Sequence, residues 1–130
     1  MNARIGLLVP LVFLALNASA QLPAQKSNAN GVTVTVTPGA LRADAGSWDF
    51  AVVLDTHSQD LSDDLAKTAV LVDDRGKEFR PIGWEGAAPG GHHRKGILKF
   101  NPIAPRPGAL ELRINRTGEG TPRVFRWNLG

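Results

Sequence analysis

The chain of 130 residues contains no cysteine, few aromatic residues and one methionine, Met1. The lack of cysteine excludes disulfides, thiolate metal sites, iron–sulfur clusters, blue-copper sites and a cysteine nucleophile. It also excludes a lipid anchor attached to a cysteine after a cleaved leader. Loss of Met1 with such a leader would remove the only thioether ligand. Any metal chemistry is therefore left to imidazole and carboxylate groups.

The first 20 residues have the three parts of a secretory signal peptide. Arg4 supplies a positive start, residues 5–16 form an apolar run, and Ala18-Ser19-Ala20 gives the small residues that signal peptidase requires. The apolar run is shorter than the roughly 20 residues of a membrane-spanning helix, so we favour cleavage over an uncleaved anchor and expect no membrane insertion. Cleavage predicts a periplasmic or secreted protein that begins at Gln21 and forms one domain.

Charges of the two signs are mixed along the chain. The formal net charge is +3, and it falls to +2 when Arg4 leaves with the leader. Nucleic-acid binding surfaces combine clustered Lys and Arg with stacking aromatics, and this chain shows neither, so we expect no nucleic-acid partner. We also expect a monomer, because Pro81 and charged residues mark the predicted edge strands.

A period of two dominates the chain after a polar segment, residues 21–31, for which we predict a disordered leader. The β-sandwich domain is expected to span residues 32–130. Seven segments are predicted strands: Val32–Thr37, Trp48–Asp55, Thr68–Val72, Lys77–Ile82, Lys95–Phe100, Ala109–Ile114 and Val124–Leu129. Their number and spacing indicate an all-β fold, an immunoglobulin-like β-sandwich, with a small Greek-key barrel as the alternative.

Between these strands, the sequence predicts one helical turn, a tight turn and a loop. The helical turn falls near residues 62–65, with Ser62 or Asp63 as its cap. The tight turn covers residues 73–76. Residues 84–91 read as a Gly/Pro-rich loop in which Trp84 either covers the core or contacts a partner.

The three histidines fall at two strand-to-loop junctions, where β-scaffolds present functional groups. Asp55 and His57 are two residues apart, so on an extended strand they share a face. Imidazole and carboxylate groups suit copper(II) or zinc, and His92 and His93 are candidates to complete the site. The acids available to support it are Asp60, Asp63 and Asp64.

A structural role accounts equally well for the same residues. Asp55 can accept backbone N–H groups where its strand ends, His57 can be a surface turn residue, and His92-His93 can pack against Trp84. Asp55, His57 and Ser58 together provide the residue types of a hydrolase catalytic triad. Sequence neighbours rarely adopt triad geometry, and no strand-turn-helix elbow surrounds the serine, so we do not expect an enzyme.

Two local resemblances accompany these patterns. Residues 48–81, ending in Val70-Leu71-Val72-Asp73-Asp74-Arg75-Gly76-Lys77-Glu78-Phe79, resemble small secreted bacterial immunoglobulin-like domains of uncharacterised function, which implies the fold. The segment Asp55-Thr56-His57 resembles the Asp-Thr-His segment of periplasmic copper-resistance C proteins, in which the Asp and His bind copper(II). In that family the segment lies late in the chain and the mature protein begins with a ligating His, whereas here the segment is central.

The sequence therefore predicts an exported, non-enzymatic β-sandwich that acts as a binding or accessory protein with no cofactor. The alternative is a periplasmic copper or zinc binder that uses Asp55, His57, His92 and His93. A hydrolase ranks third. The predicted partner is an unidentified protein for the binding or accessory function and a metal ion for the alternative.

Overall fold

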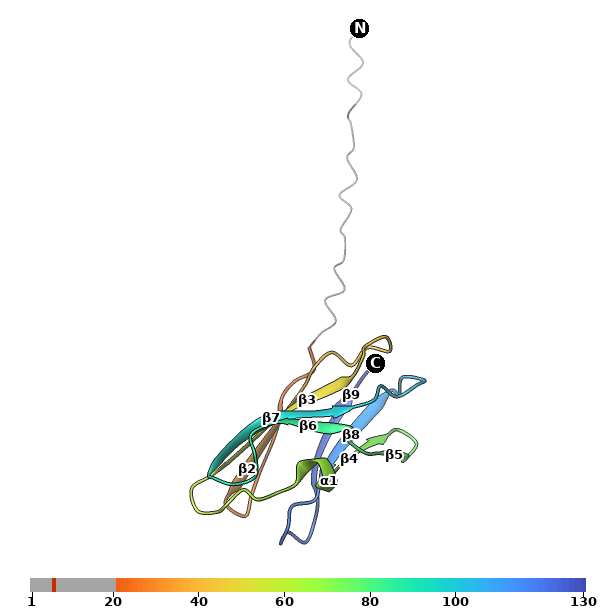
Figure 1. Ribbon diagram of the computed structural model, residues 1–130. Helices are drawn as coiled ribbons and strands as arrows, with labels where there is room; N and C mark the ends of the chain where they lie inside the picture. Colours follow the sequence, from red (N-terminus) through yellow and green to blue (C-terminus); the bar gives the residue numbers. More distant parts are fainter. Residues whose placement is uncertain (1–5, 7–20) are drawn as a thin grey trace.

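The structure, a computed structural model, describes Gly6 and residues 21–130 (Figure 1). Apart from Gly6, the predicted signal peptide lies outside the described residues. The described chain forms nine strands and one helical turn: β1 (Gln25–Ala29), β2 (Val32–Pro38), β3 (Trp48–Thr56), α1 (Leu65–Thr68), β4 (Ala69–Asp73), β5 (Glu78–Phe79), β6 (Gly83–Gly86), β7 (His93–Phe100), β8 (Ala109–Ile114) and β9 (Arg123–Asn128). No helix in this part of the chain is long and apolar enough to cross a membrane.

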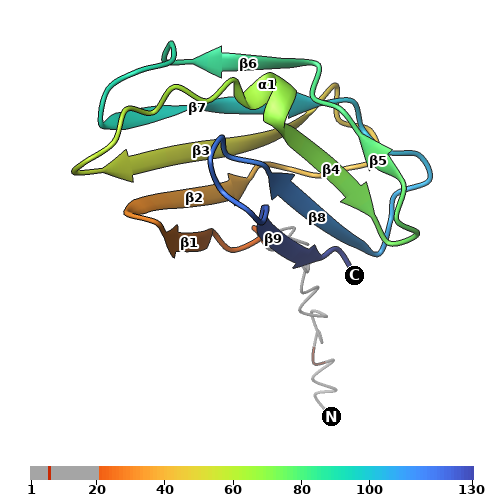
Figure 2. The same ribbon diagram turned by 90° about the horizontal axis from the view of Figure 1, so that it is seen from below.

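The strands form two antiparallel sheets that pack as two layers, as Figure 2 shows. One sheet has the order β1-β2-β3-β7-β6, and the other has the order β5-β4-β8-β9. Each of the seven predicted strands overlaps one of these nine. The predicted all-β fold is confirmed, and its two packed sheets are consistent with a β-sandwich.

The core lies between the sheets and follows the predicted alternation. Val34 lies opposite Leu54 in the register of β2 and β3, and both side chains are fully buried. Phe50 packs its ring against Phe100 and Trp127, with centroid distances of 5.6 and 5.7 Å. The core positions predicted for Trp48 and Trp127 are therefore confirmed.

The expectation of a disordered leader over residues 21–31 is wrong for β1. Residues 25–29 pair with residues 32–36 of β2 in an antiparallel hairpin. Asn30 and Gly31 form its two-residue turn with φ values of +52° and +75°, the type I′ combination that Asn-Gly favours. The polar composition of β1 gives no alternating apolar pattern from which to predict a strand. The pairing of β1 depends on the turn and the sheet edge, not on a buried face.

The expected loop at residues 84–91 also begins as a strand, β6, which pairs with β7. Glycines permit this close packing: a Cβ on Gly86 would lie 2.4 Å from Gly96 Cα, and a Cβ on Gly96 would lie 2.4 Å from the Trp84 ring. Trp84 packs against the core, as the core-covering alternative predicted. The helical turn is confirmed but lies later than expected, with Asp64 in the cap position and no side-chain cap bond.

Candidate functional site: one end of the sandwich

Four connections meet at one end of the sandwich, which we call the loop end. They are the β1–β2 turn (30–31), the segment after β3 (57–64), the β6–β7 connection (87–92) and the β8–β9 connection (115–122). Backbone hydrogen bonds join the second and third of these: Leu61 N–H donates to Gly91 O at 3.0 Å, and Gly90 N–H donates to Leu61 O at 2.8 Å. The loop end contains all the candidate site residues predicted from the sequence.

Asp55 and His93 come together at the loop end, from β3 and β7. They are direct cross-strand partners, and His93 Nδ1 contacts Asp55 Oδ1. More than half of each side chain is exposed to solvent. The contact fixes the orientation of the imidazole ring and leaves its Nε2 atom for a ligand. An exposed pair of this kind adds only about 0–1 kcal/mol to stability.

His57 and His92 are exposed at the same end. The backbone places His92 beside Thr56, whose N–H donates to His92 O at 2.9 Å. The acids predicted to support a metal have other partners: Asp60 accepts Gly91 N–H, and Asp63 binds Arg116. Within residues 21–130, no group of three or more His, Asp or Glu side chains is placed to hold a metal ion.

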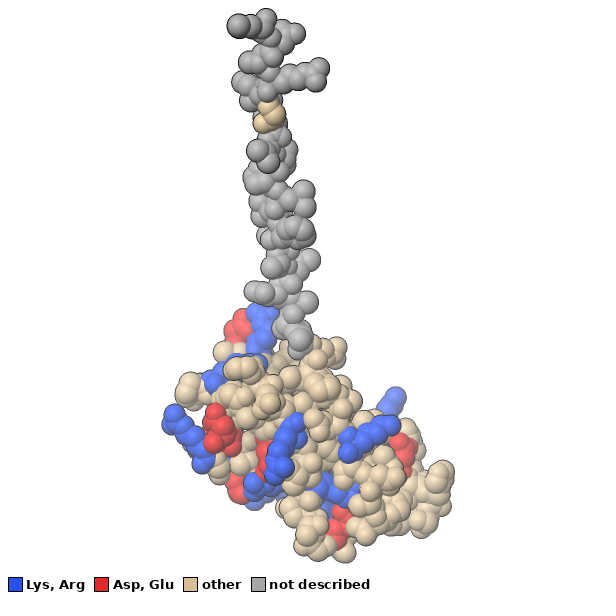
Figure 3. All heavy atoms as spheres, turned by 180° about the vertical axis from the view of Figure 1, so that it is seen from behind, with Lys and Arg blue, Asp and Glu red and all other residues tan. Residues whose placement is uncertain are grey.

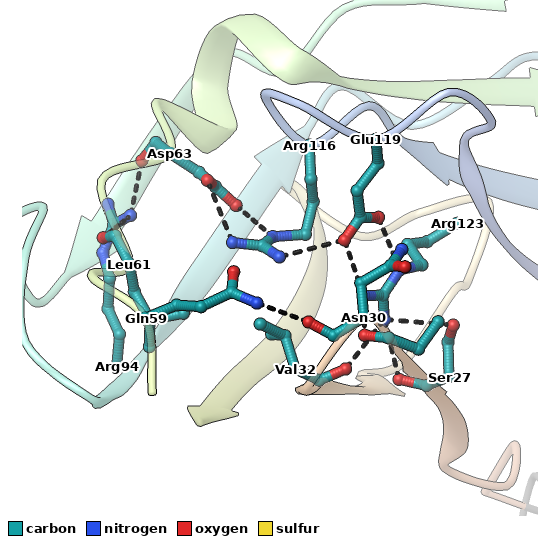
Figure 4. Close-up of polar contacts among 11 residues, drawn as sticks. Ser27, Asn30, Val32, Gln59, Leu61, Asp63, Arg94, Arg116, Glu119 and Arg123 are labelled. Carbon is teal, nitrogen blue, oxygen red and sulfur yellow. Dashed lines mark hydrogen bonds and ion pairs between the residues drawn. The ribbon is translucent and has the colours of Figure 1, made fainter. Parts of the chain in front are cut away.

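Beneath these exposed residues lies a buried charged cluster that the sequence did not reveal (Figure 4). We define it as Asp63, Arg94, Arg116, Glu119 and Arg123. Arg116 binds Asp63 through two nitrogens, at 2.7 and 3.4 Å, and Glu119 through a third, at 3.0 Å. The Arg116 side chain is only 4% exposed. Its hydrogen bonds therefore connect the 57–64 segment to the 115–122 connection in a region that water does not reach.

Arg123 extends the cluster to the first strands. Two of its nitrogens bind the Glu119 carboxylate at 2.7 and 2.8 Å. The same guanidinium donates to the carbonyl oxygens of Ser27, Ala29 and Val32, at 2.9, 2.8 and 3.1 Å. One buried side chain thereby joins the 115–122 connection to both sides of the β1–β2 hairpin.

Arg94 links the β6–β7 connection to the 57–64 segment. It is 1% exposed and donates to the carbonyl oxygens of Ala87, Leu61 and Asp63. Its guanidinium carbon lies 5.2 Å from the centre of the Trp84 ring, a cation–π arrangement. Carbonyl dipoles and an aromatic face thus solvate this buried charge.

Electrostatics keep Glu119 and Arg116 ionised. The hydrogen bond from Arg123 is the main reason that the pKa of Glu119 lies below its ordinary value, and it outweighs the effect of burial. Burial disfavours the charged form of Arg116, yet the hydrogen bonds and charges of Asp63 and Glu119 together outweigh burial and raise the pKa of Arg116. The Glu119 carboxylate and the Arg116 guanidinium therefore face each other as an ion pair at neutral pH.

The fold defines an all-β protein of two packed antiparallel sheets. No protein-family model matches the chain, and no curated protein matches it either. Among solved structures, it is similar to the crystal structure of a DUF4426 family protein from Pseudomonas aeruginosa PAO1, with 15% sequence identity and a TM-score of 0.46. The match covers 80% of this chain and 93% of that one. The resemblance to copper-resistance C proteins finds no counterpart in these comparisons.

Proposed function

We propose that this is an exported, periplasmic or secreted, non-enzymatic protein that binds a protein partner through its loop end, as a monomer and without a cofactor. The observation that carries the proposal is the buried charged cluster. A buried ion-pair network adds little stability over an apolar core of the same volume. What it supplies here is a fixed arrangement of four connections, and a preformed surface binds without the cost of ordering loops.

The strand order supports an immunoglobulin-like assignment of the sandwich. If β2, β3, β6 and β7 are strands A, B, D and E, the first sheet reads A-B-E-D, with β1 added at its edge. The second sheet reads C′-C-F-G, with β5 as C′. The loop end then carries the B–C, D–E and F–G loops. Antibody variable domains bind antigen through the loops at this end, an analogy at the level of the fold.

The surface charges favour a site that recognises one specific partner over a surface that attracts any molecule of opposite charge. Figure 3 shows basic and acidic side chains interspersed over one face. A binding surface of this kind selects its partner by shape and by individual polar contacts.

Site-specific photo-cross-linking in the producing cell tests the binding function. A photoreactive residue replaces Gln59 or His92 at the loop end, and Arg75, in the turn between β4 and β5 at the opposite end, serves as the matched control. We expect one defined cross-linked product from both loop-end positions and none from the control. Equal products from all three positions, or none from the loop end, would contradict the proposal. Export is tested separately by the mass of the periplasmic protein, which should begin at Gln21.

A second candidate function, copper or zinc binding, is favoured by the Asp55–His93 contact. A carboxylate on Nδ1 is the usual support of a metal-binding imidazole. Titration of the exported protein with copper(II) and zinc, compared with His93→Ala and His57→Ala, tests this function. Saturable binding that both substitutions weaken at least tenfold supports it. Binding that either substitution leaves unchanged removes that histidine from the site.

A further inference from the structure

A pocket of about 880 Å³ lies at the end of the sandwich opposite the loop end. The segment between β2 and β3 (39–44), Arg106 and the residues after β9 line it. Leu22, Leu41 and Leu129 supply apolar wall, while Ala40 and Ala43 have side chains too short to fill the space. The volume lies within the roughly 300–1,000 Å³ typical of small-molecule sites.

Arg106 gives this pocket a fixed positive group. Its Nε donates to Leu41 O at 2.7 Å and its Nη1 donates to Leu129 O at 2.8 Å, which fixes the plane of the guanidinium. A guanidinium carries five N–H groups, and these two bonds use two of them. Arg106 makes no ion pair within residues 21–130, whereas the other guanidinium on the pocket, Arg42, is paired with Asp44 at 2.7 Å.

An immobilised cation without a carboxylate partner, set in a largely apolar wall, complements an anion on an apolar body. We propose that this pocket binds a free aliphatic carboxylate of medium chain length. The carboxylate of the ligand accepts hydrogen bonds from Arg106, and the aliphatic chain of the ligand packs against the leucine side chains. Charge-assisted bonds to a guanidinium are the strong class of hydrogen bond, and burial of the chain adds up to about fourfold in affinity per methylene. The site lies away from the loop end and does not depend on the function proposed for it.

Calorimetric titration of the exported protein below the micelle concentration tests this site. The ligands are octanoate, decanoate, dodecanoate and the uncharged 1-decanol. We expect affinity to rise with chain length and decanoate to bind at least tenfold more tightly than decanol. Arg106→Gln should remove that preference for the anion, and Ala43→Leu, which fills the pocket, should weaken both ligands.

Arg75→Gln, on the exposed β4–β5 turn, is the control and should bind like the unsubstituted protein. Thermal unfolding of each variant shows that it is folded. Should Arg106→Gln not fold, Arg106→Lys, which keeps the charge but not the planar donor pair, should lose part of the preference. Equal affinity for decanoate and decanol would overturn the proposal. So would binding to phosphatidylglycerol vesicles without binding to free decanoate.

Discussion

Glu119→Gln is expected to destabilise the fold by about 3 kcal/mol, because it removes one of two anions from a buried cluster that holds three cations. The Glu119 side chain is 7% exposed and accepts three hydrogen bonds from Arg116 and Arg123. Breaking a buried ion pair by changing one partner costs about 3–5 kcal/mol. The lower figure applies because glutamine keeps one acceptor oxygen and Arg123 keeps its bonds to carbonyl oxygens. For a domain of this size the loss corresponds to a Tm lower by about 12 °C or more.

Equilibrium unfolding in urea, followed by tryptophan fluorescence, measures this change in the free energy of unfolding. The effect also depends on pH. The pKa of Glu119 is lower in the folded protein than its ordinary value, so its contribution is complete above about pH 5 and is lost as pH falls through the folded pKa. The difference between the two proteins should therefore be constant near neutrality and should shrink in acid.

Glu78→Gln is the matched control, because Glu78 is 55% exposed and lies 4.0 Å from its nearest cation, on Arg113. We expect it to change the free energy of unfolding by less than about 0.5 kcal/mol. If Glu119→Gln cost no more than this control, or if its effect grew in acid, the structural role given to the cluster would be refuted.

Three further substitutions test other features of the fold by the same unfolding measurement, with Gly83→Ala, where a Cβ meets nothing within 4 Å, as the common control of near-zero effect. Gly96→Ala should cost about 1–3 kcal/mol because its Cβ would overlap the Trp84 ring; a cost equal to the control would mean that β6 does not pack here. Gly31→Ala should cost about 1 kcal/mol or more because its φ is +75°; an unchanged or higher stability would argue against the type I′ turn. His93→Ala should cost less than about 1 kcal/mol because its ion pair is exposed; a larger loss would show that the pair is structural.

The alternation of apolar side chains predicted most of the strands because both sheets bury one face. In β2, every second residue from Val32 is buried, and the sequence shows that pattern directly. The strand β1 has no such pattern, and its signal was the Asn30-Gly31 pair, the strongest short-range indication of a hairpin. The strand β6 was missed because its glycines suggest a loop, whereas they actually permit close contact between neighbouring strands.

The candidate site was predicted only in part. The metal-site hypothesis required the two strand-to-loop junctions to lie together, and the β3–β7 register brings Asp55 to His93. The buried charged cluster was not predicted, because Arg116 and Asp63 are 53 residues apart and nothing local distinguishes a buried arginine from an exposed one. The single local signal was the close spacing of Arg116, Glu119 and Arg123, from the β8–β9 connection to the first residue of β9.

The buried charged cluster should hold the loop end in one arrangement before any partner binds, and amide hydrogen exchange measures this. We predict that the amides of Leu61, Gly90 and Glu119, which donate to backbone oxygens, are protected in the unsubstituted protein. In Glu119→Gln, these amides should exchange at least tenfold faster, while the amide of Gly76, in the turn at the opposite end, is unchanged. Unprotected exchange of the loop-end amides in the unsubstituted protein would show that the loop end is not preformed.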